Sequence, residues 1–258
     1  MLLALDAGNT QIVLGLINQG NIVCSWRLTT DKSRTEDELW VSIKLLCEDA
    51  GISVSKINRV IISSVVPQMN DTLFMLASEY LNTPPLFVKP DLPYRHDFLE
   101  GRFPTLGSDR ICNMYAALTS YPLPQIIVDL GTATTYDILS PEGKYAGGAI
   151  APGIRTSSAN LFQAAAQLSG VPMRFPQTPI GTDTPTQLRS GILWGAVDQV
   201  DGMVRRIIKT TGWEFPVILA TGGLAEMVAE KTETITETIP DLTLQGLNII
   251  ADEIIPET

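Results

Sequence analysis

The feature that most constrains the fold is a weak internal repeat. One apolar run ends in Asp6-Ala7-Gly8, and another, in the second half of the chain, ends in Asp129-Leu130-Gly131. A second apolar run follows in each half, and a glycine, Gly20 or Gly143, comes fourteen residues after the aspartate. Each half is therefore expected to form strand, tight turn, strand, turn, strand. This duplicated meander, followed by helices, predicts two similar α/β domains with a cleft between them.

Helical periodicity follows each meander. Leu39, Ile43 and Leu46 are spaced to share one face of a helix over 36–50. Further helices are expected over 68–81, 108–118, 153–168 and 185–209, buried strands at 60–62 and 217–220, and a loop over 171–183. Pro122 and Pro124 interrupt the pattern, so we expect one domain over 1–121 and the other over 122–258.

Composition and charge exclude several classes of function. The 258 residues carry a net charge of −10, without a basic cluster, which disfavours nucleic-acid binding. No apolar run reaches the roughly 18 residues of a membrane span, and the first residues do not have the pattern expected of a signal peptide. A soluble cytoplasmic protein is therefore expected. Because His96 is the only histidine, a carboxylate is the better candidate for any catalytic base.

The two Asp-x-Gly turns have the chemistry of a phosphate site. A glycine allows the backbone to approach a ligand, and successive N–H groups form an anion-binding concavity. Asn9, Thr10 and Thr132 add polar side chains. Asp6 and Asp129 would repel a phosphate, so they would act through a bound Mg²⁺ or its waters. One such turn is common in ordinary hairpins, but two in matching positions favour a nucleotide site.

Glycine-rich segments occur at two further strand ends. The range 147–153 leads from a strand into a helix, and Gly222 and Gly223 lie between another strand and helix. Free N–H groups and the positive end of the dipole make a helix N-terminus suitable for phosphate. Either segment alone is also compatible with ordinary loop glycines. Neither a P-loop nor a Rossmann fingerprint is present.

The sequence Gly107-Ser108-Asp109-Arg110 has two interpretations. Ser108 or Asp109 could cap the helix that follows. Alternatively, Arg110 could hold the polar end of a small hydroxy acid while Asp109 accepts its hydroxyl proton.

The segment before the last long helix is similarly ambiguous. Thr184 could cap that helix, with Pro185 in its first turn. Gly191 and Gly195 lie four residues apart and leave room on one helix face for close packing, for which a dimer interface is one use.

Together these motifs resemble the type III pantothenate kinases, within the acetate and sugar kinase, Hsp70 and actin superfamily. The resemblance runs nearly end to end and rests on the segments 6–10, 107–110, 129–134, 147–153, 181–191, 221–225 and 242–247. It implies two actin-like, ribonuclease H-like domains. It also implies ATP-dependent phosphorylation of pantothenate to 4'-phosphopantothenate, the first step of coenzyme A biosynthesis.

The resemblance further implies roles for particular residues. Asp109 would be the general base, and the pantothenate-binding residues would be Gly107, Ser108, Arg110 and Thr184. The nucleotide and Mg²⁺ would be bound by Asp6, Gly8, Asn9, Thr10, Gly131, Thr132, Gly222 and Gly223. Asp129 would help to hold a monovalent cation, potassium or ammonium. Thr184 would reach the substrate of a partner subunit, which implies a homodimer with a shared site.

One segment departs from the family pattern. Members often carry Tyr-x-Asn-Pro just before the Gly-x-Asp-Arg motif, whereas this chain has Gly101-Arg102-Phe103-Pro104. A tyrosine contact to pantothenate is therefore either lost or supplied by Tyr94.

Other functions remain open at this point. A phosphohydrolase of the same superfamily would activate water, whereas a kinase must exclude it. A non-enzymatic regulator is the second alternative, and the acidic charge counts against its binding DNA directly. A sugar kinase is disfavoured because no second carboxylate cluster for a sugar is found. Whether ATP consumption requires pantothenate separates the kinase from the hydrolase.

Overall fold

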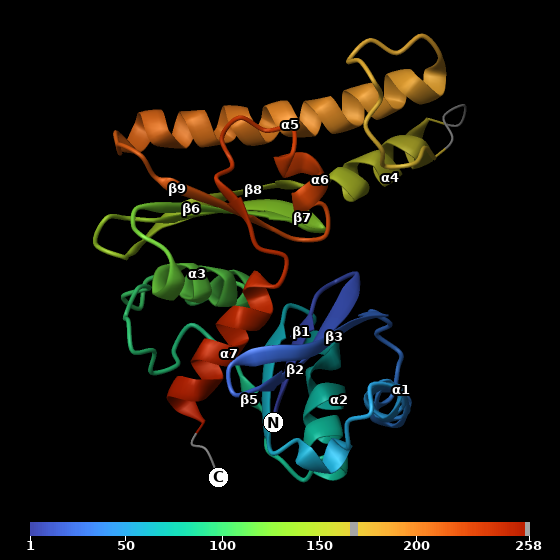
Figure 1. Ribbon diagram of the computed structural model, residues 1–258, viewed down its shortest axis with the longest axis vertical. Coiled ribbons are helices and arrows are strands. Elements are labelled where there is room, and N and C mark those ends of the chain that lie inside the picture. The colour runs from blue at the N-terminus through green and yellow to red at the C-terminus, as the bar shows by residue number, and fades with distance from the viewer. Residues whose placement is uncertain (166–169, 256–258) are drawn as a thin grey trace. The chain divides into compact units, whose positions relative to one another are not determined.

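The computed structural model describes residues 1–165 and 170–255, which form two compact units (Figure 1). Unit 1 contains residues 1–119 and the chain from Leu242 onward, and unit 2 contains residues 120–241. Among the described residues, no helix combines the length and apolar character needed to cross a membrane.

The sheet of unit 1 has the strand order β3-β2-β1-β4-β5. Its strands are β1 (Leu2–Ala7), β2 (Gln11–Asn18), β3 (Asn21–Thr29), β4 (Arg59–Ser64) and β5 (Leu86–Phe87). The first three strands form an antiparallel meander, and β4 adds to β1 in parallel. This is the meander that the Asp-x-Gly pattern predicts.

The sheet of unit 2 has the equivalent order, β8-β7-β6-β9-β10. Its strands are β6 (Gln125–Leu130), β7 (Ala133–Leu139), β8 (Tyr145–Pro152), β9 (Val217–Thr221) and β10 (Glu237–Thr238). Both meanders have an irregular register near the end of their second strand. Gly20 and Gly143 also match, with left-handed φ angles of 78° and 74°. The duplicated pattern in the sequence is thus a duplicated topology.

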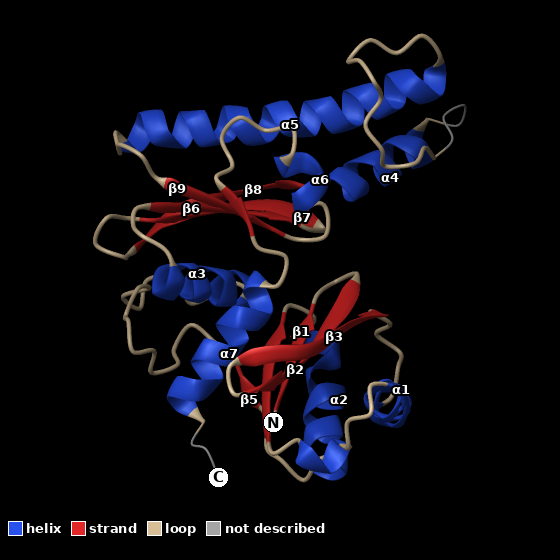
Figure 2. Cartoon of the chain, viewed as in Figure 1, coloured by secondary structure: helices blue, strands red, loops and turns tan. Residues whose placement is uncertain are grey.

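The structure contains the helices expected from the sequence and one further helix, Leu242–Ile254, for which none was expected (Figure 2). They are α1 (Glu36–Asp49), α2 (Asn70–Met75), α3 (Ser108–Ser120), α4 (Ile154–Ala164), α5 (Thr184–Thr211), α6 (Ala225–Ala229) and α7 (Leu242–Ile254). The expected helix over 68–81 is composite: a 3-10 turn, η2 (Pro67–Met69), precedes α2, and a π-helical turn, η3 (Leu76–Tyr80), follows it. A 3-10 turn, η1 (Val54–Lys56), precedes β4. Residues 166–168 of the expected helix 153–168 lie outside the described residues.

Strand alternation assigns the two faces of the sheet in unit 1. Leu3 and Leu5 of β1 belong to one buried cluster with residues of α1 and α2. Asp6 and Ser63 alternate with members of that cluster, so they lie on the opposite face of the sheet. The alternation therefore removes both polar side chains from the main apolar core.

In unit 2 the long helix α5 covers one face of the sheet (Figure 1). Leu193, Val197 and Val200 of α5 pack with Val128 of β6 and Tyr136 of β7. Alternation along β6 places Asp129 on the other face from Val128.

The last helix departs from the expected division into domains 1–121 and 122–258. The chain enters unit 2 at Ser120, close to the expected boundary, but α7 returns and packs against β1 and β4 of unit 1. A Cβ atom on Gly246 would collide with the backbone of Cys112, so α7 and α3 pack closely because this position is glycine. This long-range packing has no local signal in the sequence.

Candidate functional site

The turn after β1 holds a carboxylate beside exposed polar groups. Asp6 is half-buried, whereas Asn9 and Thr10 are exposed. The Gly8 N–H donates to the Gln11 carbonyl at 3.0 Å, which closes the turn. The hydroxyl of Thr30 donates to the Gly8 carbonyl at 2.6 Å, so the end of β3 braces the turn.

Asp6 is also connected to β4 and α3 by two buried hydroxyls. Ser63 lies opposite Asp6 in the parallel register of β1 and β4, and it is fully buried. Its Oγ donates to Asp6 Oδ1 at 2.8 Å and lies 3.0 Å from the Oγ of Ser108. Neither serine was expected from the sequence to contact Asp6.

The start of α3 corrects the capping hypothesis for Ser108 and Asp109. The first helical hydrogen bond runs from the Ile111 N–H to the Gly107 carbonyl, so Gly107 occupies the N-cap position. The Oδ1 of Asp109 folds back and accepts from the Arg110 N–H at 2.8 Å. A Cβ on Gly107 would lie 2.5 Å from that same oxygen. Glycine therefore leaves room for the carboxylate in this position.

The surroundings of Asp109 make it a stronger base than an ordinary aspartate. Burial raises the pKa of its carboxyl above the usual value of 3.8, and the N–H and positive charge of Arg110 offset part of this shift. A carboxylate with a raised pKa accepts a proton more readily, which suits general-base chemistry.

A buried thiol lies next to the same carboxylates. Burial, followed by the negative charges of Asp6 and Asp109, raises the pKa of Cys112 well above its usual value. The thiol is therefore neutral at physiological pH and adds no negative charge to those of Asp6 and Asp109.

In unit 2 the turn after β6 has a similar construction but is one residue shorter. The Gly131 N–H donates to the Ala133 carbonyl at 3.1 Å. Gly222, with a left-handed φ of 96°, packs against this turn, and a Cβ on it would lie 2.5 Å from Asp129 Oδ1. A Cβ on Gly223 would meet nothing within 4 Å. The two glycines therefore differ: the first accommodates the carboxylate, and the second is open.

The glycine segment 147–153 also reaches the Asp129 turn. The Thr132 carbonyl accepts from the Gly153 N–H at 3.1 Å and from the Thr156 hydroxyl at 2.7 Å. Gly153 is the N-cap of α4. Unit 2 thus brings Asp129, Gly131, Thr132 and Gly222 together at the end of β6.

Tyr94 is held by its surroundings in unit 1. Its hydroxyl donates to the Lys89 carbonyl at 2.5 Å, and its ring packs against Phe98 and Tyr115 at centroid distances of 5.8 and 5.2 Å. Burial raises the pKa of the Tyr94 phenol, so it remains protonated.

Thr184 is not the cap of α5, contrary to one sequence interpretation. The N-cap is Asp183, whose carboxylate accepts from the Thr186 N–H at 2.8 Å, and the Thr186 side chain completes a capping box. Thr184 and Pro185 are the first two helical residues. Thr184 is exposed, and its side chain is not needed to cap the helix, because Asp183 does so.

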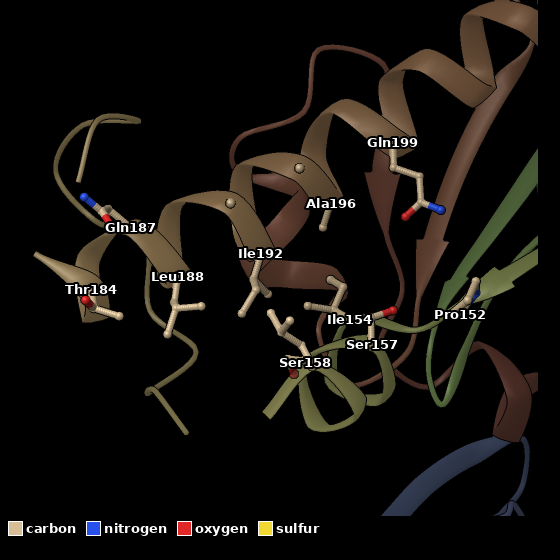
Figure 3. A pocket seen from close by; sticks show the side chains of 13 residues that line it. Pro152, Ile154, Ser157, Ser158, Thr184, Gln187, Leu188, Ile192, Ala196 and Gln199 are labelled. Carbon is tan, nitrogen blue, oxygen red and sulfur yellow. The ribbon is translucent and has the colours of Figure 1, made fainter. Parts of the chain in front are cut away.

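A groove of about 510 Å³ runs between α4 and α5 (Figure 3). Thr184 lies at one end of the labelled side chains and Pro152 at the other. Between them the lining is largely apolar, with Leu188 and Ile192 on α5. Gly191 and Gly195 also line the groove, and a Cβ on either would meet nothing within 4 Å. The space that the small-residue spacing predicts is therefore present.

Several residues of these clusters were missed by the sequence analysis. Ser63 lies near the end of β4, Thr30 directly follows β3, and neither these residues nor Cys112 belong to a motif. The position of Ser63 at the end of the parallel strand beside β1 was the available signal, because the ends of parallel strands meet at one edge of a sheet.

Comparison with known families gives a match over most of the chain. The family model described as type III pantothenate kinase matches residues 2–206. A type III pantothenate kinase from Desulforapulum autotrophicum is 43% identical over 98% of this chain and 97% of its own. One from Halalkalibacterium halodurans is 38% identical over 97% of this chain and 98% of its own.

Solved structures show the same fold at low identity. An inorganic polyphosphate/ATP-glucomannokinase from Arthrobacter sp. strain KM has a TM-score of 0.52 and 13% identity, covering 98% of both chains. Component A of the Acidaminococcus fermentans (R)-2-hydroxyglutaryl-CoA dehydratase has a TM-score of 0.55 and 13% identity, covering 96% of this chain and 94% of its own. These likenesses bear on the fold alone, which is the expected two-domain α/β class of actin-like ATPases.

Proposed function

The chain belongs to the type III pantothenate kinase family, and from this premise we propose how its own residues divide the work of the reaction. Family membership makes it an ATP-dependent kinase that phosphorylates pantothenate in coenzyme A biosynthesis. The assignments of individual residues, metal ions and subunits that follow are proposals.

Asp109 is the general base. Its carboxylate accepts the proton of the pantothenate hydroxyl as the hydroxyl oxygen forms a bond to the γ-phosphorus of ATP. The bond between that phosphorus and the oxygen bridging to the β-phosphate breaks, and ADP leaves with the electron pair. The raised pKa of Asp109, caused by burial, supports this role. Gly107, Ser108 and Arg110 bind pantothenate, and the Arg110 guanidinium suits its carboxylate.

The turn of unit 1 binds phosphate and Mg²⁺. Asp6 provides a carboxylate held in place by Ser63, and the exposed Asn9 and Thr10 provide polar groups after Gly8. Oxygen ligands of this type fit Mg²⁺. When bound, Mg²⁺ neutralises charge on the phosphates.

The turn of unit 2 binds the nucleotide and a monovalent cation, potassium or ammonium. Gly131 and Thr132 offer backbone and hydroxyl groups to phosphate, the open position at Gly223 allows close approach of the nucleotide, and Gly222 lets this turn pack against Asp129. Asp129 helps to hold the cation. The strongly acidic chain and the triphosphate together supply the negative charge that such a cation offsets.

A second copy of the chain completes the pantothenate site. Thr184 is exposed at the start of α5 and lines the groove beside α4. The open space over Gly191 and Gly195 leaves room for a partner helix. We assign this groove to the homodimer contact, from which Thr184 reaches the partner's substrate. Tyr94 contributes the edge of its ring to pantothenate, because its hydroxyl is already bonded to Lys89.

The observation that carries these assignments is the partly desolvated Asp109 carboxylate at the start of α3. Replacing Asp109 with asparagine removes the proton acceptor and retains the side-chain shape. We therefore expect kcat to fall by about two orders of magnitude or more, with nearly unchanged ATP affinity. A coupled ADP-release assay with and without pantothenate, Mg²⁺ and potassium measures this.

The same assay separates the kinase from a phosphohydrolase. ADP release should require pantothenate and should collapse when a large organic cation replaces potassium at equal ionic strength. Isothermal titration of ATP into the variant checks its binding step. A wild-type kcat in Asp109→Asn would contradict the role of Asp109 as general base. A rate that does not depend on potassium would contradict the proposed role of the monovalent cation.

A further inference from the structure

Two buried serines connect parts of unit 1 to which the proposed function gives separate tasks. Ser63 is 0% exposed and Ser108 is 6% exposed, and their hydroxyl oxygens lie 3.0 Å apart although the residues are 45 positions apart in sequence. Ser63 comes from β4 and Ser108 from the first turn of α3, directly before Asp109. Residues buried between a sheet and a helix are ordinarily apolar, because burying a polar group has a cost unless it is hydrogen-bonded.

The single proton of each serine hydroxyl determines which serine is the donor in the hydrogen bond between Ser63 and Ser108. A serine hydroxyl has one proton to donate. Ser63 donates to Asp6 Oδ1 at 2.8 Å, so Ser108 must be the donor in the bond between the two serines. The result is a chain of two hydroxyls that ends at the Asp6 carboxylate. Hydrogen bonds in such a chain polarise and so strengthen one another.

We propose that Ser63 is a positioning residue that, supported by Ser108, fixes the Asp6 carboxylate in the orientation used for Mg²⁺-ATP and couples that orientation to the first turn of α3. The inference rests on the proposed role of Asp6. Ser63 touches neither substrate in this account, and it acts only through the carboxylate that it holds.

The geometry at Ser63 specifies a hydroxyl of serine size. Its side chain faces away from the cluster formed by α1 and α2, towards α3. The thiol of Cys112, one helical turn after Ser108, lies against the same hydroxyl. An alanine here would remove this donor from Asp6 Oδ1, and the carboxylate would be held less firmly in its orientation.

The chain offers a matched control in the next residue. Ser64 is on the same strand but faces the opposite side of the sheet, and its hydroxyl bonds only locally, to the backbone of Val66 at 3.3–3.4 Å. Ser64→Ala therefore removes the same atom from the same strand without touching Asp6.

The test is the contribution of Mg²⁺ to ATP affinity, measured by isothermal titration with Mg²⁺ and with a chelator in the full chain. The measured quantity is the dissociation constant of ATP with chelator divided by that with Mg²⁺. Losing one hydrogen bond to a carboxylate should reduce this ratio by about tenfold in Ser63→Ala, while the affinity for ATP without Mg²⁺ stays unchanged. Ser64→Ala should retain the wild-type ratio. Ser108→Ala should reduce the ratio less than Ser63→Ala, and the double variant should be no worse than Ser63→Ala, because the hydroxyls act in series.

Three results would overturn the proposal in distinguishable ways. An unchanged ratio in Ser63→Ala, while Asp6→Asn loses the ratio, overturns the positioning role and leaves that of Asp6 intact. An unchanged ratio in Asp6→Asn overturns the assignment of Asp6 and the inference that rests on it. An equal loss of affinity with and without Mg²⁺ in Ser63→Ala indicates a structural role only. Should Ser63→Ala fail to fold, the same comparison is made with Ser108→Ala.

Discussion

At the scale of single residues, the environment of each aspartate differs more than its sequence context. Asp6 receives a hydroxyl bond from Ser63, whereas Asp109 folds back onto the N–H of Arg110. Asp129 lies against Gly222. Three aspartates beside glycines therefore have three surroundings, which supports giving them separate roles. Hydrogen bonds to an ionised carboxylate favour its charged form, and burial disfavours it.

The raised pKa of Asp109 predicts the pH dependence of the reaction. A general base must be unprotonated, so kcat/KM for pantothenate should fall as the pH decreases, with a midpoint above the ordinary aspartate value of 3.8. A pH profile of kcat/KM for pantothenate, which reports the pKa values of the free enzyme, measures the midpoint. A midpoint at or below the ordinary value would contradict the effect of burial.

The same shift fixes the sign of the stability change in Asp109→Asn. Because the pKa is higher in the folded than in the unfolded chain, the ionised carboxylate destabilises the fold once the pH rises through the folded-state pKa. The asparagine variant should therefore melt no lower than wild type at neutral pH. Thermal melts of both proteins at neutral and acidic pH provide the comparison.

At the scale of elements, the two sheets have the same topology but are covered by different helices. Each meander has a polar turn between its first two strands, and each is covered on one face by helices, α1 and α2 in unit 1 and α5 in unit 2. The opposite faces carry Asp6 and Asp129. A helix start or a glycine turn then approaches each carboxylate, which is how repeated strands acquire different partners.

The turn between β9 and α6 tests whether the close contact between Gly222 and Asp129 requires a glycine. An alanine at Gly222 would place its Cβ 2.5 Å from Asp129 Oδ1 and would impose a side chain on a φ of 96°. We expect Gly222→Ala to lower the free energy of unfolding by about 1–3 kcal/mol. Gly223→Ala, where a Cβ meets nothing within 4 Å, should stay within about 0.5 kcal/mol of wild type.

Chemical denaturation of the two variants measures this difference. The pair is matched, because both changes add one methyl group to adjacent glycines. Equal stability of the two variants would show that the Asp129 turn moves aside without cost.

At the scale of the whole molecule, the acidic chain and the groove on unit 2 set the expected assembly. The groove beside α5 is apolar, open over two glycines, and bordered by Thr184. A packed partner helix would remove this apolar surface from water, which is the main favourable term in association. Close approach of two helices is easiest where side chains are absent.

The prediction is a homodimer that a charge in the groove disrupts. Sedimentation should find a dimer for wild type and a monomer for Gly191→Glu, because burying an unpaired carboxylate at an interface is costly. Gly202→Glu is the control: it lies on the same helix outside the groove, and a Cβ there also meets nothing within 4 Å. It should stay dimeric.

The KM for pantothenate tests whether the dimer contact contributes to the proposed shared site. If Thr184 completes the partner's pantothenate site, the monomeric Gly191→Glu should have a higher KM for pantothenate while its circular dichroism stays native. A dimeric Gly191→Glu with normal KM would place the subunit contact elsewhere.

The sequence by itself determined the repeated meander, the covering helices and the positions of the Asp-x-Gly turns. These features follow from hydrophobic periodicity and turn chemistry, which act between residues close in sequence. Only the tertiary structure decided that α7 returns to unit 1, that Gly107 caps α3, and that Gly222 but not Gly223 touches a carboxylate. It also brought Ser63 to Asp6 and Ser108. Such contacts join residues far apart in sequence, and they depend on which strands and helices pack together, for which no short stretch of residues carries a pattern.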